Sequence, residues 1–222
     1  MQKRFAVPLI VGTALFGCAT AAFSAAGYEG YADLLTEAPW FDGARSTIDY
    51  QATIVADDVA VWSGIDNNEE DDDDLKWIQG GWGQRVGEDA KIYWEYTDET
   101  GTYRIGYDQA PGASETYEQS RNNDNVEWKH GPTIYKTEAW DKFDTIEFRK
   151  VQYGAEMADT PNDHTPGTAA SKNKCAASTA RKAGGAFAFT GLAYENNDAV
   201  NGNVEKYDPA DSGNFRTWDS RN

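Results

Sequence analysis

The sequence predicts an all-β protein, a β-sandwich or jelly roll made of two antiparallel sheets. Short segments that are apolar, or that alternate apolar with polar residues, recur from Thr47 onward, and this pattern is typical of strands. Turn-forming sequences such as DETG, APGAS, NNDN and HGP separate these segments every ~8 to 15 residues. No segment has apolar residues at helical spacing. Many short strands with regular turns favour a sandwich.

One β-sandwich domain is predicted over residues 47–222, because the chain has neither a linker nor an internal repeat. An irregular lead-in is expected over 27–46. The expected strands are, in order, 47–56 (TIDYQATIVA), 59–65 (VAVWSGI), 75–83 (LKWIQGGWG), 90–98 (AKIYWEYTD), 102–109 (TYRIGYDQ), 116–120 (TYEQS), 125–130 (NVEWKH), 133–139 (TIYKTEA), 144–157 (DTIEFRKVQYGAEM) and 185–194 (GAFAFTGLAY).

A secretory signal peptide is predicted over residues 1–26. Lys3 and Arg4 precede an apolar run that is interrupted by Gly and Pro and ends in small residues, AFSAAG. Cleavage after Ala22, Ser24 or Ala26 would give a secreted or envelope protein without a transmembrane segment. The sequence LFGC loosely resembles a lipobox, so a lipid anchor on Cys18 is the alternative.

The mature chain is strongly acidic. Removing Lys3 and Arg4 changes the net charge from −17 to −19. Nucleic acid is therefore excluded as a partner, because phosphate binding needs a clustered basic face. The charge also disfavours anionic membranes. We expect a soluble monomer whose surface charges repel other copies.

No cofactor or metal is expected. His130 and His164 lie far apart in the sequence, outside any ligand spacing. The acidic run from Asn67 to Asp74 lacks the glycine and the alternating spacing of a calcium loop, so a solvated loop is expected there. Cys175 has no activating motif beside it, which indicates an incidental thiol.

Three polar residues interrupt segments that otherwise look like strands: Gln79, Glu95 and Glu156. Side chains alternate along a strand, so Glu95 shares a face with Tyr93 and is opposite to Trp94. A carboxylate among aromatic residues is costly unless it is hydrogen-bonded or lies on a wet face. The three residues are therefore expected to share one surface.

The motifs VWSGID, WIQGGW, IYWEYTD and GAEM, in this order, resemble the glutamic peptidases of the eqolisin type, whose fold is a concanavalin A-like sandwich. The resemblance covers about 47–159 and the closing segment FAFTGLAYENN. The chain departs from the family pattern in its acidic insertion after Asp66, in Met157 where an aromatic residue is usual, and in lacking the disulfides of the fungal enzymes. The residues that match the family motifs are Trp62, Asp66, Gln79, Glu95 and Glu156.

The resemblance implies hydrolysis of polypeptides. Glu156 would be the general base that activates water and would then protonate the leaving amine, while the Gln79 amide would donate to the oxyanion. Asp66 and Glu95 would orient these groups, and crowded carboxylates favour activity in acid. Trp62, Trp82 and Trp94 would form apolar walls for the substrate, and the glycines beside Gln79 would let the substrate backbone approach.

Two other interpretations stay open. The first is a noncatalytic, lectin-like sandwich that binds polysaccharide through exposed aromatic side chains. The second is an acidic surface protein in which Gln79 is a hydrogen-bonded residue of the sheet and the tryptophans belong to the core.

Overall fold

The structure is a computed structural model that describes part of the chain. The predicted signal peptide with Cys18, and residues 70–73 of the acidic run, lie outside that part. The described residues are 28–51, 59–69, 74–85, 87–157, 166–188, 193–196, 202–206 and 213–219.

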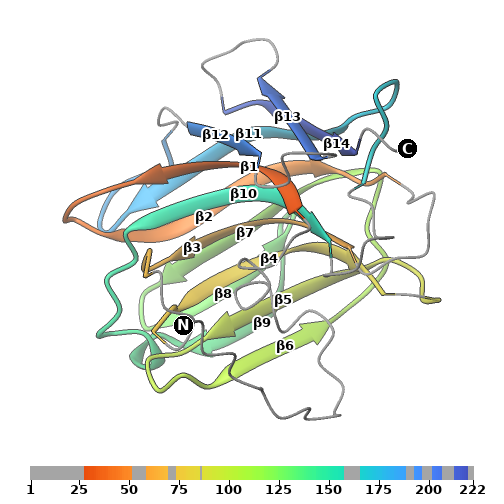
Figure 1. Cartoon of the computed structure of the whole chain (residues 1–222). Helices are drawn as coiled ribbons and strands as arrows, with labels where there is room; N and C mark the ends of the chain where they lie inside the picture. The colour runs from red at the N-terminus through yellow and green to blue at the C-terminus, as the bar shows by residue number, and fades with distance from the viewer. Residues whose placement is uncertain are drawn as a thin grey trace, which may run out of the picture.

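Two antiparallel sheets of seven strands each are stacked on one another (Figure 1). Sheet A consists, in spatial order, of β12 (Ala193–Asn196), β1 (Tyr28–Leu35), β10 (Lys150–Met157), β3 (Val59–Asp66), β4 (Trp77–Gln84), β5 (Lys91–Thr97) and β6 (Tyr103–Tyr107). Sheet B consists of β13 (Gly202–Lys206), β14 (Phe215–Asp219), β11 (Asn173–Lys182), β2 (Phe41–Asp49), β7 (Ser114–Asn122), β8 (Asn125–His130) and β9 (Thr133–Ala139). Within the described residues the helical structure is one 3₁₀ turn, Trp140–Lys142. The predicted all-β sandwich is confirmed.

The region expected to be an irregular lead-in, 27–46, instead contains β1 and most of β2. In β2 the two residues that resemble turn signals have other roles. The Asp42 carboxylate accepts a hydrogen bond from Arg181 Nε at 2.6 Å. Gly43 is packed so closely that a Cβ there would lie 2.9 Å from the Cβ of Ser120. Strands β11, β13 and β14 were also missed, because their sequences are polar or rich in alanine.

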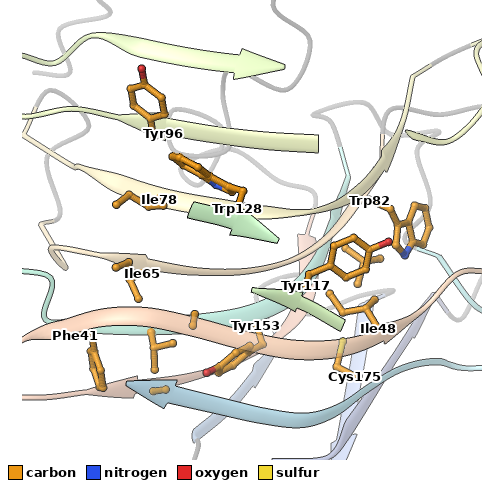
Figure 2. Close-up of a cluster of buried hydrophobic side chains, with 14 of the residues drawn as sticks. Phe41, Ile48, Ile65, Ile78, Trp82, Tyr96, Tyr117, Trp128, Tyr153 and Cys175 are labelled. Carbon is orange, nitrogen blue, oxygen red and sulfur yellow. The ribbon is translucent and has the colours of Figure 1, made fainter. Parts of the chain in front are cut away.

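The core lies between the two sheets. Figure 2 shows part of it, with Trp82 and Ile78 of sheet A close to Trp128 and Tyr117 of sheet B. Burial of each such side chain contributes about 1.5–3 kcal/mol to folding. Cys175 also lies in this core, where burial raises the pKa of its thiol and keeps it protonated.

The acidic run is the loop of the β3–β4 hairpin, and Asn67 closes the base of that loop. The Asn67 amide donates to Asp74 O at 2.9 Å, and its side-chain oxygen accepts from the Lys76 N–H at 2.9 Å. The insertion therefore leaves the pairing of Asp66 with Trp77 intact. No helix in the described part of the chain is long and apolar enough to cross a membrane.

The turn between β5 and β6 is organised by the Asp98 carboxylate. Its Oδ1 accepts from the Thr100 hydroxyl at 2.7 Å and from the N–H groups of Thr102 and Thr100 at 2.9 and 3.0 Å. Burial alone would raise the pKa of Asp98. These hydrogen bonds and the nearby Lys142 ammonium outweigh burial and lower that pKa below its usual value.

Replacing Gly81 by alanine is expected to unfold the β3–β4 pair. A Cβ at Gly81 would lie 1.9 Å from Val61 O and 2.8 Å from the Trp62 Cα, so the backbone itself must move. We expect the free energy of unfolding to fall by more than about 3 kcal/mol, measured by urea denaturation. The control is Gly87→Ala, where no atom lies within 4 Å of the added Cβ and only the positive φ of +73° is strained. Gly87→Ala should lower the free energy of unfolding by about 1 kcal/mol. An equal loss of stability in both variants would contradict the packing argument.

The Asp98→Ala variant should lose stability in a pH-dependent way. At pH 7 we expect a loss of about 1–2 kcal/mol in the free energy of unfolding, because hydrogen bonds to a charged acceptor disappear. A depressed folded-state pKa stabilises the protein above the unfolded-state pKa, and this stabilisation is lost as the pH falls through the folded-state pKa. The difference in free energy of unfolding between wild type and Asp98→Ala should therefore become smaller below about pH 4, as measured by urea denaturation. Asp144→Ala, at an exposed aspartate, should show no such narrowing.

Candidate active site

The candidate residues are sorted by the two faces of sheet A. On β4 the side chains of Ile78 and Trp82 enter the core, so Gln79 lies on the outer face. Register places four residues level with one another across the strands, and we call them the polar row. The polar row consists of Gln152 on β10, Gly64 on β3, Gln79 on β4 and Glu95 on β5.

Gln79 and Glu95 form a buried pair at the centre of this face. The exposed fractions of the two residues are 6% and 0%. The Gln79 amide nitrogen donates to Glu95 Oε1 and, at 3.3 Å, to the Tyr93 hydroxyl. The amide therefore has a fixed direction on the outer face of the sheet.

Two more donors hold the Glu95 carboxylate. Trp77 Nε1 donates to its Oε1 at 3.3 Å, and the Tyr103 hydroxyl donates to its Oε2 at 2.9 Å. Hydrogen bonds of this kind favour the ionised carboxylate and offset the loss of water around it. Since both oxygens accept hydrogen bonds from the protein, Glu95 is suited to orienting Gln79.

Trp62 lies on the same outer face, one row away from Gln79. Its neighbours in register are Gly81 on β4 and Gly154 on β10, so no side chain flanks the indole across the strands. The residue is 3% exposed, and among the described residues its Nε1 has no hydrogen-bond partner. A buried indole N–H is normally paired, and this donor would be available to a ligand acceptor only once the groups that bury it move aside.

Asp66 lies at the end of β3, level with Trp77 and Lys150. Its Oδ1 accepts from the Asn68 N–H at 2.7 Å. With the Gln152 amide oriented to suit both of its neighbours, Gln152 donates to Asp66 Oδ2 at 3.2 Å and accepts from Lys150 Nζ at 2.7 Å. Asp66 thereby connects the loop base to the polar row through Gln152.

Glu156 and Gln79 are not level with one another in the register of sheet A. Glu156 pairs with Ala60 and Gln79 pairs with Gly64, an offset of four residues along β3. With about 3.3 Å per residue and about 4.8 Å between strands, the two Cα atoms are roughly 16 Å apart. The carboxylate that register brings to Gln79 is that of Glu95. The side chain of Glu156 is outside the described part of the structure.

Trp82 and Trp94 lie on the inner face, which corrects the expectation that they form walls for a substrate. Trp82 is buried in the core, and its Nε1 donates to Asp49 O at 3.3 Å. Trp94 packs on Tyr96 and Trp128 with ring centroids 6.0 Å apart in each pair. Even positions of β4 and β5 face the core, and both tryptophans occupy even positions.

The glycines beside Gln79 also have a different role from the expected one. Gly80 faces the core, where a Cβ would lie 2.9 Å from Gln119 Nε2 and 3.0 Å from Trp128 Cδ1. Gly81 is in contact with the backbone of β3. Both glycines allow close packing within the protein.

Three residues that contact the Gln79–Glu95 pair were not predicted as members of the site: Trp77, Tyr93 and Tyr103. Trp77 precedes Gln79 by two positions, and Tyr93 precedes Glu95 by two, so alternation alone places each beside its partner. Tyr103 comes from the next strand, and finding it required the β5–β6 register. No group of three or more His, Cys, Asp or Glu side chains that could hold a metal ion occurs among the described residues.

Removing the Glu95 carboxylate is expected to destabilise the protein strongly. In Glu95→Ala the buried donors of Gln79, Trp77 and Tyr103 all lose an acceptor, so we expect the free energy of unfolding to fall by at least about 3 kcal/mol. Urea denaturation at pH 7 measures this change. The control is Glu88→Ala, which removes an exposed carboxylate paired with Lys91 at 3.0 Å and should change stability by less than about 0.5 kcal/mol. Similar losses in the two variants would show that the Glu95 hydrogen bonds do not stabilise the fold.

Comparison with known proteins identifies the fold. No family model matches the chain, and no curated protein matches its sequence. The structure of scytalido-glutamic peptidase with a transition state analog inhibitor matches 87% of this chain and 98% of that chain, with a TM-score of 0.59 and 11% identity. The structure of SCP-B, a member of the eqolisin family of peptidases in complex with the tripeptide Ala-Ile-His, matches 87% of this chain and 100% of that chain, with a TM-score of 0.53 and 11% identity. The chain therefore has the sandwich fold of the glutamic peptidases, and the resemblance seen in its motifs is confirmed at the level of the fold.

Proposed function

We propose that the chain is an exported, glutamic-peptidase-like hydrolase that cleaves polypeptides on the outer face of sheet A. The observation that carries the proposal is the Gln79 amide, which a buried carboxylate holds in a fixed direction on the outer face of a peptidase fold. A preorganised amide donor is suited to stabilising the oxyanion that forms when water attacks a peptide carbonyl.

The Gln79 amide nitrogen carries two hydrogens. One is bonded to Glu95, which sets the orientation of the amide. The other points at the Tyr93 hydroxyl, 3.3 Å away, in a longer and weaker contact. In the transition state this second hydrogen would be donated to the substrate oxyanion in place of the Tyr93 hydroxyl. Catalytic hydrogen bonds are often long before substrate binds.

Glu156 is the proposed general base, on the strength of the family motif. Each side chain can reach about 5 Å from its Cα, judged from standard bond lengths. A Cα separation of roughly 16 Å exceeds the combined reach of the two side chains, so water would have to lie between the Glu156 carboxylate and the Gln79 amide. That water would lie above Trp62, whose unpaired N–H could hold the carbonyl of an extended peptide.

The carbohydrate-binding alternative loses support on this face. Sugar stacking needs exposed aromatic rings, yet Trp62 and Tyr93 are buried and Trp82 and Trp94 face the core. The acidic surface protein is favoured by one observation, since Gln79 is itself buried and hydrogen-bonded to other protein groups. Activity measurements separate this second candidate from a peptidase.

The test is cleavage of an unfolded protein substrate between pH 2 and 8. We expect wild type to be most active in acid, and Gln79→Ala to lower kcat about 10²- to 10³-fold because one oxyanion donor is lost. Gln84→Ala removes an amide from the same strand outside the site and serves as the matched control, with activity close to wild type.

Variants of the two glutamates decide which carboxylate activates water. Glu156→Gln should abolish cleavage, whereas Glu95→Gln should lower it while the protein stays folded. Full activity in Glu156→Gln together with none in Glu95→Gln would make Glu95 the base and overturn the role of Glu156. A folded wild type without cleavage at any pH would remove the peptidase proposal in favour of the acidic surface protein.

A further inference from the structure

Three side chains of sheet B donate hydrogen bonds to backbone carbonyls around Gln79. Trp128 Nε1 on β8 donates to Gln79 O at 2.9 Å, and Gln119 Nε2 on β7 donates to Gly80 O at 3.2 Å. The Tyr135 hydroxyl on β9 donates to Tyr93 O at 3.0 Å. Three neighbouring strands of sheet B thus reach the backbone of β4 and β5, the two strands that carry Gln79 and Glu95.

These donors are themselves fixed by their surroundings. Trp128 is fully buried, with its ring centroid 5.8 Å from that of Tyr96 and 6.0 Å from that of Trp94. Gln119 is also fully buried, and its Oε1 accepts from the Ser63 hydroxyl at 2.8 Å. Close-packed side chains with satisfied hydrogen bonds have little freedom to move.

Gly80 makes this approach possible. Because Gly80 has no side chain, Gln119 and Trp128 can approach its backbone closely. A Cβ at this position would lie 2.9 Å from Gln119 Nε2 and 3.0 Å from Trp128 Cδ1. The residue following Gln79 is therefore adapted to receive donors from sheet B.

Pairing of buried donors alone does not account for this convergence. In the same core the hydroxyls of Tyr117 and Tyr153 are buried and have no hydrogen-bond partner in the part of the chain that the structure describes. The core thus leaves some polar atoms unpaired, while the donors near Gln79 are directed at three carbonyls within a small region.

We infer that Trp128 is a positioning residue for the proposed reaction, because its indole N–H fixes the backbone from which the Gln79 side chain projects. The inference rests on the proposed function. Trp128 holds the main chain of Gln79 from the core side, and Glu95 holds its amide on the outer face. With both ends of the residue anchored, the amide nitrogen stays in the direction that an oxyanion donor requires.

The test compares Trp128→Phe with Trp140→Phe, which shortens a buried tryptophan that packs against Phe143 and Phe148. We expect Trp128→Phe to lower kcat at acid pH by about tenfold or more with little change in KM, since a small misplacement of a catalytic group has a large effect on rate. Trp140→Phe should stay within about twofold of wild type in kcat.

A second measurement does not depend on activity. The side-chain amide resonances of Gln79, assigned in ¹⁵N-labelled protein by their loss in Gln79→Ala, should shift in Trp128→Phe and stay in place in Trp140→Phe. If Trp128→Phe fails to fold, benzothienylalanine at position 128 keeps the size of the indole and removes only the N–H donor, and the same shift is expected.

The outcomes separate the two proposals. If wild type does not cleave protein, the proposed function fails while the amide resonances still decide whether Trp128 positions Gln79. Unchanged Gln79 resonances in the folded Trp128 variants, or a loss of kcat no greater than in Trp140→Phe, would overturn the inference.

Discussion

The hydrogen bond from the Gln79 amide to the Glu95 carboxylate is the interaction on which the outer face of sheet A depends. A carboxylate without exposure to water is stable only when it accepts hydrogen bonds, and Glu95 accepts them from Gln79, Trp77 and Tyr103. These three donors come from β4 and β6, on either side of β5, so the pair also fixes the register of three strands. A slip of β5 by one residue would place Glu95 on the face opposite all three donors.

The inner face makes a second demand on the same strand. The core must supply donors to the carbonyls of Gln79 and Gly80, and it must do so without a side chain at position 80. β4 is thus constrained on its inner face by Gln119 and Trp128 and along its edge by the backbone of β3 at Gly81. This explains why WIQGGW combines bulky aromatic residues with adjacent glycines. The aromatic residues fill the core and the space beside Glu95, and the glycines allow close contact of two backbones and two sheets.

Much of the fold could be predicted because β3 to β10 follow the alternation rule. The faces of Ile92, Tyr93 and Glu95 follow from sequence position alone, and the structure places them accordingly. The first strands could not be predicted this way. In β2, Asp42 and Gly43 resemble turn residues, and their true roles depend on Arg181 and Ser120, which are distant in sequence.

For the candidate residues the sequence could predict the face of the sheet but not the arrangement across the strands. Position parity assigned a face to Gln79 and Glu95, whereas the level of each residue across the sheet depends on strand register, which no local pattern encodes. The incorrect roles given to Trp82 and Trp94 have a different cause. An aromatic residue near a candidate amide looks like a substrate contact in the sequence, yet alternation already assigned both to the face opposite Gln79.

The position of Trp62 determines how a substrate could meet both Gln79 and Glu156. The offset of four residues along β3 corresponds to about 13 Å, which is the length of about four residues of extended peptide. Between these two levels the face offers Gly81, Gly154 and the indole of Trp62, and the N–H of this indole has no hydrogen-bond partner in the described structure. A peptide lying along the strands could accept this N–H with a backbone carbonyl while presenting the next carbonyl to Gln79.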